Sequence, residues 1–128
     1  MGEQYLIDSN AAIDYLGGKL PASGISFMNK VVNDIYKISI ITKIEMLGYN
    51  APEKDEHILI DFIESSLVLD LSDEVVTKTI TLRKKHKIKI PDAIIAATAI
   101  CFKLTLISRN ETDFKNIPQL KIINPFSL

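Results

Sequence analysis

The sequence predicts an α/β fold, a three-layer α/β/α sandwich around a central parallel sheet of about five strands. Short apolar, β-branched segments alternate along the chain with longer segments of helical periodicity. Such alternation is typical of a parallel sheet that helices cover on both faces. The chain has 128 residues, of which 47% are hydrophobic and 24% charged, and this balance predicts one globular domain over residues 1–128.

Five segments are predicted as strands because each is short, apolar and followed by polar or turn residues. They are residues 5–8, 38–42, 67–71, 104–108 and 120–124. Helices are expected over residues 9–16, 25–37, 43–50, 53–65 and 74–87, and after Pro91. Phe27, Val31 and Ile35 recur every four residues in the second helix, as do Ile58 and Phe62 in the fourth. These side chains are therefore expected to be buried.

The segment "IKIPDAIIAATAI", residues 88–100, places Asp92 at the start of a run so apolar that its helix must be buried on nearly every side. A carboxylate at this place is costly to bury unless its charge is used. One interpretation is that Asp92 caps the helix, a role that contributes about 1 kcal/mol. The other is that Asp92 belongs to a binding or catalytic site.

Four acidic residues stand at junctions of the predicted elements: Asp8, Glu45, Asp92 and Asp113. Three come at or soon after the carboxyl ends of strands, where ligands bind in parallel sheets. Each also has a structural alternative. Asp8, Asp92 and Asp113 could cap helices, and Thr42 with Glu45 fits a capping box.

If the four acids converge, their mutual repulsion requires protonation or a cation. Carboxylate oxygens with open water positions suit Mg²⁺ or Mn²⁺. Such an ion can activate water and neutralise a phosphoryl oxygen. Nearby polar residues could orient ligands or waters, namely Ser9, Asn10, Thr42, Ser108 and Asn110.

Other features exclude several classes of function. The formal net charge is −1, which provides no global basic field for nucleic acid. Cys101 is the only cysteine, so an internal disulfide or a cysteine zinc site cannot form, and we expect a buried thiol. His57 and His86 lack a second ligand at metal spacing and are expected on solvated helices. No signal peptide or membrane span is evident, which favours a cytoplasmic protein.

The segments "YLIDSN", "TKIE", "IPDAIIAATAI" and "LISRNETDF" resemble, in order and spacing, the motifs of PIN-domain ribonucleases. The likeness is strongest to the small VapC-type toxins of toxin–antitoxin pairs. It extends over essentially the whole chain, and "PDAIIAATA" is its most specific part.

This resemblance implies a strand order 3-2-1-4-5 and Mg²⁺-dependent hydrolysis of RNA phosphodiesters. It makes Asp8, Glu45, Asp92 and Asp113 the acidic quartet, with Asp8 and Asp92 as the principal metal ligands. Polar support positions fall on Asn10, Thr42, Ser108 and Asn110, while Ser9 stands where Thr is commoner in the family. The resemblance also implies an antitoxin partner, bound near the N-terminal helices, and a homodimer.

Two surfaces have more than one interpretation. The basic cluster "RKKHKIK", residues 83–89, is either the solvated end of a helix or a rim that attracts the RNA backbone. The apolar face with Phe27, Met28 and Val31 either packs within the chain or binds a partner.

Three alternatives to a toxin ribonuclease are considered. A PIN nuclease of RNA maturation has the same motifs. A PIN-fold binding protein without activity is disfavoured because all four acids are present. A signalling receiver needs a phosphoacceptor after strand three and a lysine after strand five, but Asp70 and Lys121 lie within the predicted strands.

Overall fold

Five short parallel strands form the centre of the computed structural model, which describes residues 3–128. They are β1 (Tyr5–Ile7), β2 (Lys37–Ser39), β3 (Leu67–Leu69), β4 (Thr105–Ile107) and β5 (Ile122–Ile123). Their order in the sheet is β3-β2-β1-β4-β5, which confirms the expected order. The order reverses between β1 and β4, and the pairing of Ile7 with Ile107 brings the carboxyl ends of these two strands level.

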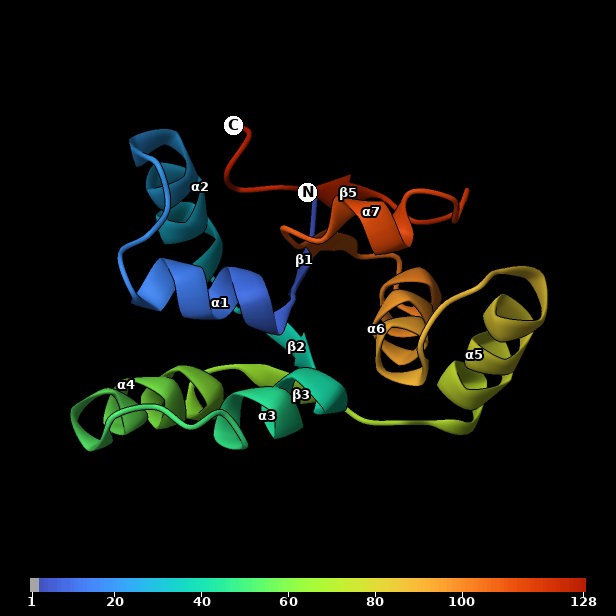
Figure 1. Cartoon of the computed structure of the whole chain (residues 1–128), viewed down its shortest axis with the longest axis horizontal. Helices are drawn as coiled ribbons and strands as arrows, with labels where there is room; N and C mark the ends of the chain where they lie inside the picture. The colour runs from blue at the N-terminus through green and yellow to red at the C-terminus, as the bar shows by residue number, and fades with distance from the viewer. Residues whose placement is uncertain (1–2) are drawn as a thin grey trace.

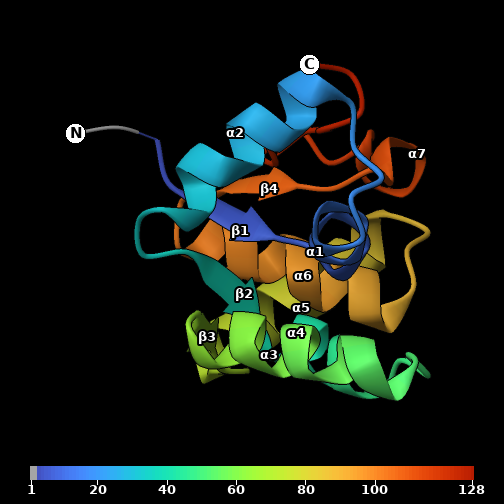
Figure 2. The ribbon, with the colours of Figure 1, turned by 90° about the vertical axis from the view of Figure 1, so that its left-hand side faces the viewer.

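Helices cover both faces of this sheet (Figure 1). In the described part of the chain they are α1 (Ser9–Leu16), α2 (Ala22–Val32), α3 (Ile40–Leu47), α4 (Glu53–Glu64), α5 (Asp73–Lys85), α6 (Ile90–Cys101) and α7 (Glu111–Phe114). Helices α1 to α4 lie on one side of the sheet, and α5 and α6 lie on the other (Figures 1 and 2). The predicted three-layer α/β/α architecture is therefore confirmed.

The two central strands bury side chains on both faces. Leu6 of β1 packs against residues of α5 and α6, whereas Ile7 packs against residues of α1, α2 and α4. Leu106 and Ile107 of β4 alternate in the same way, and all four side chains are fully buried. Because successive strand residues point to opposite faces, a strand covered on both sides must be apolar throughout.

The second strand ends earlier than predicted. Ser39 caps α3, and its hydroxyl oxygen accepts a hydrogen bond from the Thr42 amide at 3.1 Å. Ile40, Ile41 and Thr42 therefore begin a helix, and the predicted capping box of Thr42 with Glu45 is wrong. A β-branched run is compatible with the first turn of a helix once a serine cap satisfies a free amide.

The buried helical faces differ in part from the predicted ones. Helix α2 ends at Val32, so Ile35 lies beyond it and is 73% exposed, although Val31 is buried as expected. Helix α4 buries Phe62 as expected but leaves Ile58 45% exposed. Ile35 is exposed because the helix has already ended, whereas the buried face of α4 consists of Leu59, Phe62 and Ile63.

Cys101, at the end of α6, is half-buried rather than fully buried. His57 is exposed on α4, as predicted, whereas His86 is half-buried and lies just past the end of α5. No helix among residues 3–128 has the length and apolar character needed to cross a membrane.

Candidate active site

Asp8 lies where the strand order reverses, directly after β1. It caps α1, and its Oδ1 accepts a hydrogen bond from the Ser9 amide at 2.8 Å. Its Oδ2 accepts hydrogen bonds from the Ser108 hydroxyl at 2.8 Å and from Asn10 Nδ2 at 3.2 Å. Asp8 is only 4% exposed, so its carboxylate is held between the start of α1 and the end of β4.

Two further acids are held beside this position by polar neighbours. The Ser9 hydroxyl donates to Glu45 Oε1 at 2.9 Å, which connects α1 to α3. Asn110 caps α7, and its Nδ2 donates to Asp113 Oδ2 at 2.8 Å. The same Asn110 donates its backbone amide to the Ser108 hydroxyl at 3.0 Å. Asp113 therefore does not cap its helix, and it is connected through Asn110 and Ser108 to Asp8.

Asp92 lies in the first turn of α6 and is not its cap. The helix begins at Ile90 with Lys89 as its N-cap residue, so the predicted capping role is wrong. Pro91 fits this first turn because the amide it lacks has no partner there. Asp92 is half-buried, and free of the capping role its carboxylate faces the other acids.

Electrostatics join these acids into one group. Burial raises the pKa of Asp8 above its ordinary value, and the charge of Glu45 raises it further, while hydrogen bonds from Ser108 and Ser9 oppose the rise. Burial also raises the pKa of Asp92, with added contributions from Asp8 and Asp113 and an opposing one from Lys89. The pKa values of Asp8 and Asp92 are therefore each raised in part by the charge of another acid of this group.

Thr42 and two residues that were not predicted, Arg109 and Asp14, lie near the acidic group. Thr42 is buried, and its hydroxyl oxygen accepts a hydrogen bond from Ser39 at 3.3 Å, so its recorded contact is to the helix cap rather than to an acid. Arg109 lies between Ser108 and Asn110, and its Nη1 is 3.1 Å from Oδ2 of Asp14 on α1.

Asp14 was not predicted as part of this site, although the sequence indicates that it is buried. It lies three residues after Ala11 on the same helical face, and both are buried. Asp14 Oδ2 has no hydrogen-bond partner of good geometry in the described residues, so Arg109 neutralises it by charge. Arg109 also donates its amide to Asn10 Oδ1 at 2.9 Å, which connects the ion pair to the Asp8 network.

The donor set suits a hard cation. Among residues 3–128 no three acids, histidines or cysteines already form a compact metal-binding group. Mg²⁺ requires no such cage, since it keeps several waters and binds through one or two carboxylates. Two carboxylates with raised pKa values, without cysteine or histidine among their hydrogen-bond partners, fit this ion or Mn²⁺, and they do not fit a closed zinc site of Cys and His.

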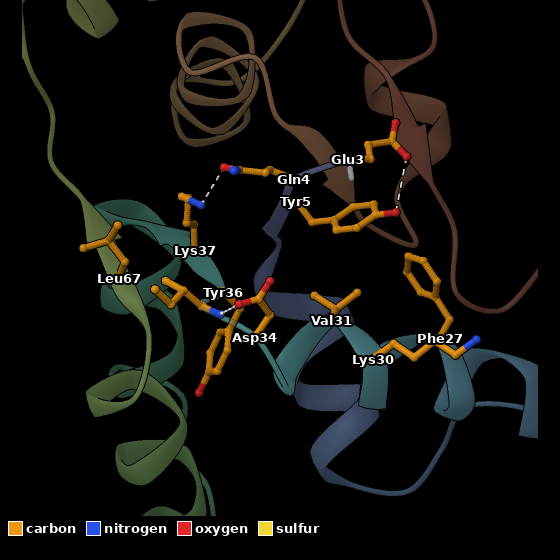
Figure 3. A pocket seen from close by; sticks show the side chains of 11 residues that line it. Glu3, Gln4, Tyr5, Phe27, Lys30, Val31, Asp34, Tyr36, Lys37 and Leu67 are labelled. Carbon is orange, nitrogen blue, oxygen red and sulfur yellow. Dashed lines mark hydrogen bonds between the residues drawn. The ribbon is translucent and has the colours of Figure 1, made fainter. Parts of the chain in front are cut away.

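Two hollows lie at opposite ends of the sheet. One, of about 590 Å³, lies at the amino ends of β1 and β2, and its lining includes Tyr5, Phe27 and Lys37 (Figure 3). It contains none of the four acids. The other, of about 670 Å³, is lined by Asp92 and Asp113 and by part of the basic cluster. The candidate active site therefore opens into the second hollow.

The fold and the site together define a doubly wound α/β domain with a carboxylate site at its topological switch point. Residues 5–120 match the family model of the PIN domain. The chain therefore belongs to the PIN domain family, the family of nucleases that its motifs resemble. Comparison with curated proteins finds no match.

Solved structures share this fold over nearly the whole chain. A toxin–antitoxin complex from Klebsiella pneumoniae contains a chain 29% identical to this one, with a TM-score of 0.76 and coverage of 95% of this chain and 98% of that chain. DNA-bound VapBC from Salmonella typhimurium is 23% identical, with a TM-score of 0.77 and coverage of 97% and 99%. FitAcB from Neisseria gonorrhoeae is also 23% identical, with a TM-score of 0.75 and coverage of 98% and 100%.

Proposed function

We propose that this chain is a divalent-metal-dependent endoribonuclease and the toxin of a toxin–antitoxin pair. The observation that carries the proposal is the position of Asp8 at the switch point, together with the effect of its charge, which raises the pKa of Asp92. Membership of the PIN domain family supports a nuclease. Mg²⁺, or Mn²⁺ in its place, is the proposed ion, and RNA is the proposed substrate.

Asp8 and Asp92 would hold the ion, with Glu45 and Asp113 completing the acidic quartet. When bound, the ion supplies an activated water and neutralises charge that develops on the phosphoryl oxygens. Ser108 and Asn10 keep the Asp8 carboxylate in one orientation through their hydrogen bonds. Ser9 does the same for Glu45, and Asn110 for Asp113. Thr42 contributes by holding the start of α3, the helix that carries Glu45.

The proposed partner is a cognate antitoxin. Its support is the likeness to a chain of the Klebsiella pneumoniae toxin–antitoxin complex over 95% of this sequence. A homodimer that acts on RNA in the cytoplasm is proposed on the family resemblance.

The test is cleavage of single-stranded RNA by the purified, antitoxin-free protein in Mg²⁺. We expect Asp92→Asn to lower the cleavage rate by about 100-fold or more. The substitution removes a carboxylate charge that would hold the metal ion, and the ion neutralises charge on the phosphoryl oxygens. EDTA should abolish cleavage. Asp61→Asn is the matched control, since Asp61 is an exposed carboxylate on α4.

Equal rates for the natural protein and Asp92→Asn would contradict the proposal. If all variants were inactive on varied RNAs and Mg²⁺ did not bind, the chain would be a PIN-fold binding protein without nuclease activity.

A further inference from the structure

The hollow next to Asp92 and Asp113 extends toward the connection between α5 and α6, which lie side by side (Figure 1). We call it the basic pocket. Its lining includes Arg83, Lys87, Lys89, Ile90, Asp92 and Asp113. Three exposed cations line one part of it, and two acids of the proposed active site line another. Its volume of about 670 Å³ lies within the range of about 300–1,000 Å³ that small-molecule sites span.

The cations of this pocket form no ion pair with the described part of the chain. Among residues 3–128 the only ion pair joins Arg109 and Asp14, although the charge of Lys89 also acts on Asp92. Cations in the last turn of α5 complement the helix dipole, which accounts for Arg83, Lys84 and Lys85. It does not account for Lys87 and Lys89, which follow the end of the helix.

An apolar surface lies between the cations and the acids. Ile90 is 55% exposed although it begins a helix in which all of residues 93–99 are buried. Pro91 and Ile88 line the same pocket. These three surfaces follow one another as the parts of a nucleic acid strand do. The cations suit a phosphate, the apolar surface suits a sugar or base, and the acids with a metal ion would suit the reacting phosphodiester.

We propose that the basic pocket binds the nucleotide next to the cleaved phosphodiester of a single-stranded RNA. Its phosphate contacts Arg83, Lys87 and Lys89, and its sugar or base lies against Ile90. The inference rests on the proposed RNA-cleaving function and assigns residues to substrate binding. It also explains how a chain with a net charge of −1 attracts a polyanion, since the positive potential is local.

The test compares two double variants that remove the same charge. Arg83→Gln/Lys87→Gln removes two cations of the basic pocket, whereas Lys84→Gln/Lys85→Gln removes two neighbours that do not line it. Binding of a fluorescein-labelled single-stranded RNA of mixed sequence is measured by anisotropy in EDTA, where cleavage does not interfere. Titrations at several salt concentrations give the slope of log Kd against log salt.

We expect the pocket variant to bind roughly tenfold more weakly, with a salt slope reduced by about 1.4, because each single-strand phosphate contact contributes about 0.7. The control variant should bind like the natural protein. In Mg²⁺ the pocket variant should raise KM for RNA cleavage and leave kcat nearly unchanged. A melting curve of each variant checks that both are folded.

Equal losses in both double variants would overturn the assignment, because they would show a general effect of charge. Unchanged binding in both would overturn it as well. A second comparison tests the apolar part: Ile90→Ser should raise KM, whereas Ile80→Ser, at a similarly exposed position on α5, should not. Absence of Mg²⁺-dependent cleavage by the natural protein would instead contradict the proposed function. The anisotropy comparison would still show whether the basic pocket binds RNA, because it does not depend on cleavage.

Discussion

At the scale of single residues, Asp8 shows how a carboxylate is kept in a costly place. It is almost fully buried, and three hydrogen-bond donors compensate only part of that cost, since its pKa stays raised. The remaining cost is mainly that of burying the charge, with a smaller contribution from the charge of Glu45. A cation bound as proposed would offset this cost, so we expect Asp8 to lower the stability of the metal-free protein.

Asp8→Asn should therefore stabilise the metal-free protein at pH 7, by on the order of 1 kcal/mol, because it removes a buried charge and keeps the shape. The gain should depend on pH. A raised pKa means that the folded state binds more protons than the unfolded state above the ordinary value of 3.8. The natural protein thus loses stability as pH rises through the folded pKa.

Urea unfolding at several pH values between 4 and 7, in EDTA, measures this effect. The difference in unfolding free energy between Asp8→Asn and the natural protein should grow as pH rises. A constant difference would show that the charge of Asp8 carries no such cost. Asp61→Asn serves as the control with an exposed carboxylate.

At the scale of elements, Arg109 holds three segments together. Its guanidinium pairs with Asp14 of α1 and lies 5.7 Å from the ring centre of Phe126 near the C-terminus. Its amide donates to Asn10. The loop between β4 and α7, which carries Ser108 and Asn110, is thereby fixed against α1.

Arg109→Gln should lower the free energy of unfolding by about 1–2 kcal/mol, because Asp14 stays buried without a counter-charge. The value is below that of a fully buried pair, since Arg109 is 56% exposed. Arg109→Lys should restore part of the loss. Adding Asp14→Asn to Arg109→Gln should also restore stability, and a double variant as unstable as Arg109→Gln alone would contradict the ion pair's role.

Helix α2 packs closely against the C-terminal segment at Gly24. A Cβ atom at this position would overlap the backbone carbonyl oxygen of Pro125, so the backbone must shift. Gly24→Ala should destabilise the protein by about 1–3 kcal/mol through overpacking, although alanine is the better helix former. Thermal unfolding measures this, with Ser26→Ala on the exposed side of α2 as the control. An increase in Tm for Gly24→Ala would contradict the close contact.

At the scale of the whole molecule, the metal is expected to join elements that are distant in sequence. Asp8 caps α1 and Asp92 lies in the first turn of α6, on opposite faces of the sheet, so an ion between them would connect the two layers. An ion that binds only the folded state adds about 2.7 kcal/mol at a concentration of 100 times its Kd.

Titration with MgCl₂ should therefore raise the Tm of the natural protein until its site saturates. The double variant Asp8→Asn/Asp92→Asn should begin with a higher Tm and show little further rise. Equal rises in both proteins would indicate that Mg²⁺ acts elsewhere or through ionic strength.

Local sequence patterns were sufficient to predict the three-layer architecture. Leu6 and Ile7 are adjacent and both apolar because β1 is buried on both faces, and the same holds for Leu106 and Ile107. The helix of residues 9–16 stops at Gly17 as predicted. Parallel order and three layers follow from such strands alternating with helices. The positions of the four acids at junctions could likewise be read from the chain, since junctions are local features.

Contacts between distant segments were decided by the tertiary structure. Ser39 rather than Thr42 caps α3, and Lys89 rather than Asp92 is the N-cap residue of α6. Ile35 and Ile58 are exposed. The hydrogen bond of Ser108 to Asp8 and the ion pair of Arg109 with Asp14 join residues about a hundred positions apart. The sequence by itself determined which residues can be apolar, charged or helix-ending. Which of them meet depended on the packing of the layers, because burial and electrostatic interaction act through space and are independent of separation along the chain.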